Sequence, residues 1–257
     1  MFAAARQAGP IRGRCADSLQ FEGGPAAYAL RVIAAAKRAP LPGSGSDGCG
    51  PVWYRRGAGL TMPPVTQALL ISNVLVFFVV QQLGPAIIGQ FALWPWASDF
   101  FRPWQLVTYA FLHGGLTHLA FNMFGLWMFG AELERVWGPR RLVQFYFASV
   151  LVAALTQLVV TAVLESRAPT VGASGGLFGL LIGFAMVFPR RMITPLIPPI
   201  PMRAPIFVGL YGALELTLGV AGTASGVAHF AHLGGLLGGW LMMRYWRGQP
   251  PFGSGRR

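Results

Sequence analysis

The sequence predicts an all-α polytopic membrane protein, a bundle of six transmembrane helices. Hydrophobic residues make up 54% of the 257 residues and charged residues only 11%, with a mean hydropathy of +0.54. This composition is too apolar for a soluble domain of this size. Apolar stretches long enough to cross a hydrocarbon core about 30 Å thick recur along the chain. The basic residues gather in alternate connections between these stretches.

The apolar stretches predict six spans. We expect them at residues 65–83, 116–133, 142–164, 174–188, 204–220 and 227–245. The connection after the first span is rich in tryptophan and phenylalanine, which is typical of a loop lying in the interfacial belt of a bilayer. The connection between the fourth and fifth spans contains prolines that break any helix there.

The first part of the chain differs in composition from the rest. Residues 1–61 are rich in Ala, Gly, Pro and Arg and show little apolar periodicity, which predicts either a disordered cytoplasmic segment or an over-extended reading frame ahead of Met62. No apolar stretch follows the first arginines, so we expect no signal peptide. Both cysteines also precede the first span. We therefore expect a six-helix domain at 62–247 and a cytoplasmic tail at 248–257.

The distribution of basic residues predicts the orientation. Eighteen of the 20 lie before the first span or after the second, fourth and sixth spans, and only Arg102 and Arg167 lie in the other connections. By the positive-inside rule both termini are cytoplasmic, and we expect a multi-pass protein of the lipid bilayer, in a bacterial inner membrane. Because the basic residues are dispersed between spans rather than gathered on one face, we expect no nucleic-acid partner.

Ser174, at the head of the fourth span, is the candidate nucleophile. Glycines at every fourth residue after it share one helix face, namely Gly175, Gly179 and Gly183. In the sixth span, His232 shares a face with Gly235 and Gly239. Small residues let helices approach closely in membranes, so we predict that the two glycine faces pack together and bring His232 to Ser174.

The depth of the polar groups supports a common site. The helix rise places Ser174 and His118 about 24 Å from the inner basic ends of their spans, and His232 about 18 Å. All three groups then lie in the outer half of the membrane. Polar groups are costly in hydrocarbon, so we expect them to face one another and a water-filled cavity that opens outward.

These residues also fit other interpretations. Gly172-x-Ser174-x-Gly176 also fits the nucleophile elbow of a soluble α/β-hydrolase, with Glu215 as an acid between serine and histidine, but the long apolar spans exclude that fold. A small transporter would show inverted repeats or broken helices near the midplane, and the sequence shows neither. Taken singly, Ser174 could also be a helix-packing residue, and His229 an interface residue one turn above His232.

Four short motifs occur in order on these spans. They are His118-Leu-Ala-Phe-Asn122 on the second span, Gly130-x-x-x-Glu134-x-x-x-Gly138 at its inner end, Gly172-Ala-Ser174-Gly175 opening the fourth span, and Ala231-His232-x-x-Gly235-x-x-x-Gly239 on the sixth. With them the chain resembles the rhomboid intramembrane serine proteases over about residues 65–246. The resemblance implies a Ser-His dyad and cleavage of transmembrane segments of single-span or polytopic substrates near the outer face. A catalytically inactive rhomboid-like binding factor is the nearest alternative, but it should lack Ser174 or His232.

The chemistry assigns a role to each residue. His232 is the base that takes the serine proton, and His118 with Asn122, at i and i+4, stabilises the oxyanion together with the backbone N–H of Ser174. We predict no cofactor and no metal, because His-Glu-x-x-His is absent and His229 and His232 lack a clear third ligand.

The chain departs from the family pattern at two positions. Gln105 follows Trp104 where the family often has Trp-Arg, and Phe178 stands where a tyrosine often stacks on the histidine. We expect Phe178 to orient His232 by stacking, so that no carboxylate is needed. Glu134 is expected to brace a loop as a structural residue. For Glu215 we favour a hydrogen-bonding role near the outer surface, although an intramembrane carboxylate is also a functional candidate.

Overall fold

The computed structural model describes residues 61–252 except 85, 196–197 and 222–225, and it does not describe the side chains of 226–228. Almost all of the predicted N-terminal segment therefore lies outside the described residues, as does the end of the tail. The helices of the bundle are α2 (Pro64–Leu83), α5 (Leu116–Gly125), α6 (Ala131–Trp137), α7 (Pro139–Val163), α8 (Ser174–Val187), α9 (Ala204–Val220) and α10 (Gly226–Trp246). A π-helical turn, η2 (Leu126–Gly130), joins α5 to α6 in one continuous run.

Each of the six predicted spans coincides with one helix or, for α5 to α6, with one helical run. The second begins at Leu116 as expected and extends to Trp137. Among the described residues, α2 and α7 are long and apolar enough to cross a membrane by length and composition, while α8 and α9 are shorter apolar helices. Proline in the first turn of α2, α7 and α9 marks where each of these helices begins. Proline has no backbone N–H, and it is tolerated there because N–H groups of the first turn have no intrahelical partner.

The connections contain the shorter elements. The first connection forms α3 (Ala86–Phe91), α4 (Gln105–Thr108) and a 3₁₀ turn, η1 (Tyr109–Phe111). A two-stranded antiparallel sheet of β1 (Met192–Ile193) and β2 (Met202–Arg203) lies between α8 and α9.

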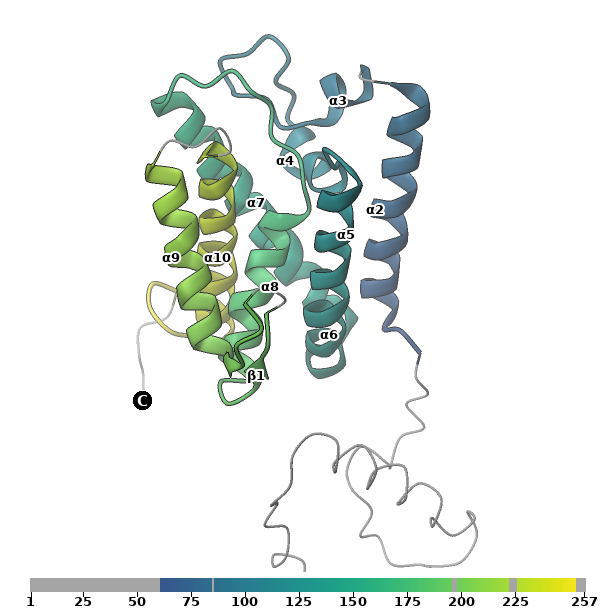
Figure 1. Ribbon diagram of the computed structural model, residues 1–257. Coiled ribbons are helices and arrows are strands. Elements are labelled where there is room, and N and C mark those ends of the chain that lie inside the picture. Colours follow the sequence, from purple (N-terminus) through teal and green to yellow (C-terminus); the bar gives the residue numbers. More distant parts are fainter. Residues whose placement is uncertain (1–60, 85, 196–197, 222–225, 253–257) are drawn as a thin grey trace, which may run out of the picture. The chain divides into compact units, whose positions relative to one another are not determined.

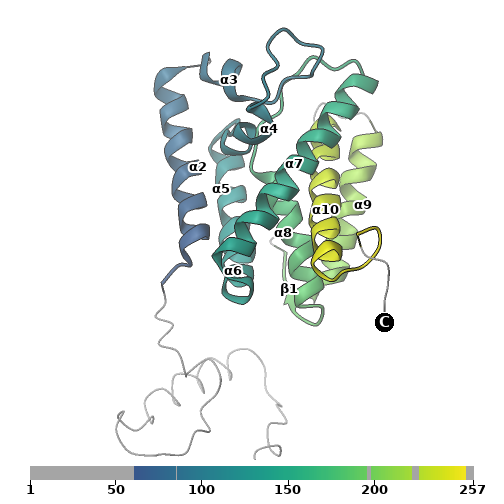
Figure 2. The same ribbon diagram turned by 180° about the vertical axis from the view of Figure 1, so that it is seen from behind.

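The centre of the bundle is the packing of α7, α8 and α10. α2 and α5 lie on one side of α8, and α9 lies on its other side (Figure 1). α7 crosses α8 and α10 obliquely, as the view from behind shows (Figure 2). One face of the central part of α7 is fully buried, and it includes Phe145, Tyr146 and Val150. By contrast, Phe78 on α2 and Leu210 on α9 are 56% and 58% exposed. The outer helices thus present apolar side chains outward, as helices that face lipid do.

The glycines of α8 and α10 allow this close packing. Gly175, Gly179 and Gly183 face Ala153, Ser149 and Phe145 of α7, which have the same spacing of four residues. The α8 glycines therefore meet α7 side chains first, which the sequence did not predict. A β-carbon on Gly239 would lie 2.7 Å from the Gly179 carbonyl oxygen, and one on Gly235 would overlap the Gly175 carbonyl oxygen. α10 thus packs its glycines directly on the backbone of α8.

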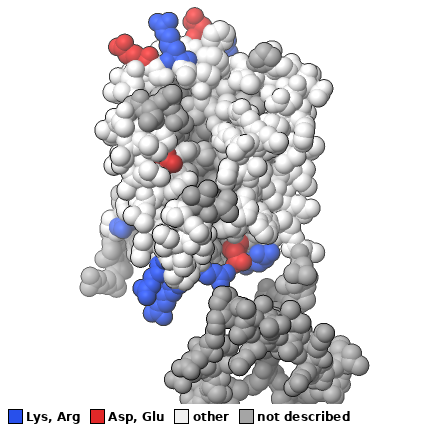
Figure 3. All heavy atoms as spheres, in the orientation of Figure 1, with Lys and Arg blue, Asp and Glu red and all other residues white. Residues whose placement is uncertain are grey.

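Charged side chains lie at the two ends of the helices, and the band between them is almost free of charge (Figure 3). Most of the visible basic atoms gather at the end where α6 and β1 lie (Figures 1 and 3). At this end the exposed Glu132 pairs with Arg135 at 3.8 Å and with Arg191 at 3.5 Å.

Glu134 has a different role from Glu132. Its side chain is buried and accepts hydrogen bonds from the backbone N–H of Val65 (2.9 Å), the backbone N–H of Thr66 (2.7 Å) and the Thr66 hydroxyl (2.8 Å). The first turn of a helix has free N–H groups and a partial positive charge, which a carboxylate satisfies. Glu134 therefore caps α2 from α6, where the sequence led us to expect a residue that braces a loop.

Gln105 organises the first connection. Its amide oxygen accepts from the backbone N–H groups of Trp94 (3.3 Å) and Arg102 (3.1 Å), and its amide nitrogen donates to the carbonyls of Gln90 (3.1 Å) and Phe100 (2.9 Å). The side chain is fully buried. A neutral amide can both donate and accept, so glutamine at this position ties the loop to itself in both directions.

Candidate active site

Ser174 and His232 are in direct contact. Ser174 is the first residue of α8, and His232 lies on α10, fifty-eight residues later. The His232 Nε2 atom lies 2.8 Å from the Ser174 Oγ atom, which is hydrogen-bonding distance. This is the geometry that a general base needs to take the proton of a serine hydroxyl.

Phe178 holds one face of the His232 ring. The two rings are stacked with centroids 4.3 Å apart and planes 4° apart. Phe178 also stacks on Tyr211 of α9, at 5.5 Å and 22°. The imidazole plane is therefore fixed by an aromatic stack that connects α10, α8 and α9.

Glu215 is a functional candidate whose contact with His232 was not predicted from the sequence. Its Oε2 atom lies 2.9 Å from His232 Nδ1 and 2.5 Å from His229 Nδ1. We expected a hydrogen-bonding role near the outer surface and a base that needed no carboxylate. Glu215 does form hydrogen bonds, but one of its partners is the candidate base itself.

The sequence contains a signal for this contact. α9 ends at Val220 and α10 begins at Gly226, so the two helices are antiparallel neighbours across a short connection. Glu215 lies five residues before the end of α9, and His229 and His232 lie three and six residues after the start of α10. Counting from this connection would have placed the three side chains at one depth.

His118 lies beside the candidate nucleophile. Gly172 has a φ of +133°, and a β-carbon there would lie 2.9 Å from His118 Cε1 and 3.4 Å from Ser174 Oγ. Glycine is thus required at residue 172 by both backbone conformation and space. Asn122 uses one of its two amide hydrogens within its own helix, because its Nδ2 atom donates to the His118 carbonyl at 2.9 Å.

His113 supports His118. The sequence analysis singled out no role for it, yet the side chain is buried and packs edge-on against the His118 ring with centroids 5.1 Å apart. Burial, together with the neighbouring His118, lowers the pKa of His113 to about 4. The ring is therefore neutral at physiological pH and packs against His118 without repelling a positive charge.

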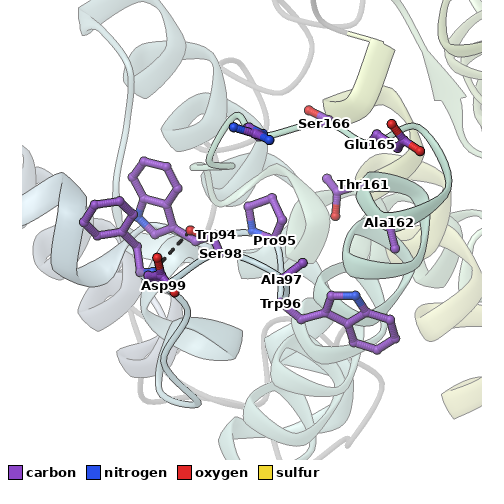
Figure 4. Close-up of a pocket in the computed structure, with 12 residues that line it drawn as sticks. Trp94, Pro95, Trp96, Ala97, Ser98, Asp99, Thr161, Ala162, Glu165 and Ser166 are labelled. Carbon is purple, nitrogen blue, oxygen red and sulfur yellow. Dashed lines mark hydrogen bonds between the residues drawn. The ribbon is translucent and has the colours of Figure 1, made fainter.

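Two hollows of the described surface are separate from these residues. A pocket of about 700 Å³ lies between the first connection and the end of α7, lined by side chains that include Trp94, Asp99 and Glu165 (Figure 4). An apolar groove of about 500 Å³ runs between α8, α9 and α10 and includes Val208 and Leu236. Neither includes Ser174 or His232.

Glu215, His229 and His232 also form a group that could hold a metal ion, with donor atoms within 4.8 Å of one another. The structure places Glu215 beside the two histidines, and Glu215 is the third ligand that the sequence pattern did not indicate. Ligand atoms around a tetrahedral zinc, each about 2.0–2.2 Å from the ion, lie about 3.3 Å from one another. The observed separations of 2.5 and 2.9 Å are shorter and suit shared protons better than a shared ion.

Comparison with known proteins agrees with this architecture. The family model described as Rhomboid domain matches residues 101–248. The chain is 31% identical over 140 residues to the rhomboid protease GluP of Bacillus subtilis, covering 54% of this chain and 25% of that protein. It is 26% identical over 187 residues to the rhomboid protease GlpG of Serratia proteamaculans and 24% identical to that of Yersinia enterocolitica, in each case covering 71% of this chain and 62% of the relative.

The chain thus spans between a quarter and just under two thirds of the length of these curated relatives. The family match covers more than half of the chain itself, and it includes the segments that contribute Ser174 and His232. This protein therefore belongs to the rhomboid family of helical, polytopic integral membrane proteins.

Proposed function

We propose that this protein is a serine endopeptidase that cleaves transmembrane segments of membrane proteins near the outer face of the membrane. The observation that supports the proposal most directly is the distance of 2.8 Å between His232 Nε2 and Ser174 Oγ. The names of the relatives, rhomboid proteases, give it independent support.

The reaction begins with the serine. His232 takes the hydroxyl proton of Ser174 through Nε2 as Oγ attacks the scissile carbonyl carbon. The same histidine then gives that proton to the leaving amine, which breaks the C–N bond and leaves an acyl-enzyme. His232 then takes a proton from water as the water oxygen attacks the ester carbonyl carbon, and it returns that proton to Ser174 Oγ as the C–O bond breaks, which releases the acid product and frees Ser174.

The tetrahedral intermediate carries a negative oxygen that needs donors. The backbone N–H of Ser174 is available because Ser174 is the first residue of α8, and the helix dipole favours an anion there. His118, beside Gly172, is the second donor. Asn122 can contribute the amide hydrogen that does not bind the His118 carbonyl.

The proposed topology has six spans, with both termini in the cytoplasm of a bacterial cell. The gathering of basic side chains at the end where α6 and β1 lie supports this orientation (Figure 3). Ser174 is the first residue of α8, and Arg190 and Arg191 follow the other end of this helix, so the substrate bond would be reached from the outer half of the bilayer. The partners are then single-span or polytopic membrane proteins within the same lipid bilayer.

Proteolysis of a single-span substrate by the purified protein in detergent tests the proposal. Wild type should release two fragments cut near the outer end of the substrate helix, and Ser174→Ala should release none. Cleavage that persists in Ser174→Ala would overturn the assignment of the nucleophile. Stable binding of the substrate without cleavage by wild type would favour the rhomboid-like binding factor, and solute flux in proteoliposomes would favour a transporter.

A further inference from the structure

We propose that Glu215 completes a catalytic triad, Ser174–His232–Glu215, as a positioning residue that α9 supplies to the base on α10. The inference rests on the proposed protease function and deepens it. The carboxylate oxygen lies 2.9 Å from His232 Nδ1, and the other ring nitrogen lies 2.8 Å from the serine hydroxyl. The three groups thus form one chain of hydrogen bonds through the imidazole ring.

The carboxylate determines which nitrogen of His232 carries the proton. An ionised carboxylate can only accept hydrogen bonds, so Nδ1 must be the protonated nitrogen of the neutral ring. Nε2 is then unprotonated and can accept the proton of Ser174. The stack on Phe178 fixes the plane of the ring but does not select the tautomer, so Glu215 supplies what the aromatic contact lacks.

Glu215 also stabilises the charge that forms during the reaction. When His232 takes the serine proton it becomes a cation whose Nδ1–H points at a carboxylate 2.9 Å away. Glu215 is only 6% exposed, so water screens this attraction weakly. Among the described residues its ion-pair partners are His229 and His232.

His229 holds the carboxylate in place. Its Nδ1 lies 2.5 Å from the same oxygen that faces His232, three residues away on the same helix. The buried carboxylate therefore has two imidazole donors, which offset the cost of removing it from water. The rival explanation is that Glu215 merely fastens α9 to α10, and the two explanations predict different effects of separate substitutions.

The test compares Glu215→Gln, Glu215→Asp, His229→Gln and Thr217→Val in the full-length protein. The measurements are two rates, kcat for the single-span substrate and covalent labelling of Ser174 by a fluorophosphonate, together with KM for the substrate. Glu215→Gln should lower kcat and the labelling rate by about 10²–10⁴-fold with little change in KM, because the amide can also donate to Nδ1 and so favours the wrong tautomer. Glu215→Asp keeps the charge and should restore part of the rate.

The other two variants are the controls. His229→Gln loosens the α9–α10 contact but leaves the bond to His232, so it should cost much less than Glu215→Gln. Thr217→Val removes a hydrogen bond to Ala213 on the exposed side of α9 and should leave both rates unchanged. Equal losses in His229→Gln and Glu215→Gln, or wild-type rates in Glu215→Gln, would overturn the triad.

A spectroscopic measurement on wild type does not depend on how the variants fold. The chain has only four histidines, so labelling them with ¹⁵N gives few imidazole signals. A strongly downfield Nδ1–H proton, assigned to His232, is expected. An Nε2–H tautomer at His232 would overturn the proposal, as would loss of wild-type labelling after treatment with a chelator, which would instead indicate a metal held by the two histidines and Glu215.

The two proposals can fail separately. Labelling of Ser174 needs no membrane substrate, so labelling that depends on Glu215 without any cleavage would support the triad and overturn the proposed substrate class. Cleavage that depends on Ser174 but not on Glu215 would support the protease and overturn the triad.

Discussion

The imidazole ring of His232 lies parallel to the ring of Phe178, with centroids 4.3 Å apart. The stack connects the proposed base on α10 to the helix that begins with the proposed nucleophile. Phe178 is buried and lies four residues, about one turn, after Ser174. Helix α8 therefore positions both Ser174 and one face of the His232 ring.

Replacing Phe178 with Leu should slow catalysis without unfolding the protein. Loss of an aromatic pair removes about 0.5–1.5 kcal/mol, which corresponds to about a 2- to 10-fold fall in kcat. Phe178→Tyr keeps the ring and should retain most of the activity. The measurement is kcat for a single-span substrate in detergent, with thermal unfolding as the check on folding. A fall in Phe178→Tyr as large as that in Phe178→Leu would argue against stacking as the cause.

Gly235→Ala should destabilise the bundle strongly. A β-carbon at this position would overlap the Gly175 carbonyl oxygen, and backbone atoms cannot move aside as a flexible side chain can. We expect a loss of at least about 1–3 kcal/mol in the free energy of unfolding, measured by denaturant titration in detergent. Gly209→Ala on α9 is the matched control, since a β-carbon there meets nothing within 4 Å. A Gly235→Ala protein as stable as Gly209→Ala would contradict the packing of α10 on α8.

Glu134→Gln should lower stability more than Glu132→Gln. Glu134 is buried and accepts three hydrogen bonds at the start of α2, so removal of its charge should cost about 2 kcal/mol or more. Glu132 forms exposed ion pairs that contribute about 0–1 kcal/mol. Thermal unfolding of the two variants under identical conditions compares them. Equal melting temperatures would show that the cap of α2 adds little.

A chain that begins at Met62 should keep its activity. Residues 1–61 contain none of the predicted spans and none of the proposed site residues. We therefore propose residues 62–247 as the catalytic unit. Expression of this shorter chain, with Ser174→Ala in the same background as its control, measures folding and cleavage together. Loss of either would show that the segment before Met62 contributes to the fold or to the site.

The cleaved substrate should contain helix-weakening residues near its outer end. An intact helix hides its carbonyls in hydrogen bonds, so it must unwind before Ser174 can attack, and glycine lowers that cost by about 1 kcal/mol relative to good helix formers. Replacing such a glycine in the substrate by Leu should slow cleavage by about fivefold. The same change at the cytoplasmic end should matter little. Mass spectrometry of the products locates the cut, and a cut at the midplane would contradict the proposed depth of the site.

The sequence by itself predicted the helices and the contact between Ser174 and His232, the two central residues of the proposed site. Six apolar stretches correspond to the helical runs because a chain in lipid must satisfy its backbone hydrogen bonds within each span. Ser174 and His232 could be paired because each lies beside glycines at helical spacing. This pairing needed no knowledge of side-chain rotamers, since small residues allow helices to approach closely whatever the details of packing.

Only the tertiary structure decided which polar groups meet. Helix α9 is apolar around almost its whole circumference, so hydropathy does not indicate which side of it faces α10, and the contact of Glu215 with His232 depends on that rotation. The same holds for His113, which reaches His118 through the fold of a loop, and for Asn122, whose amide binds the backbone of its own helix. Rotation and side-chain direction follow from packing between helices, whereas the sequence pattern of a single helix determines mainly where it begins and ends.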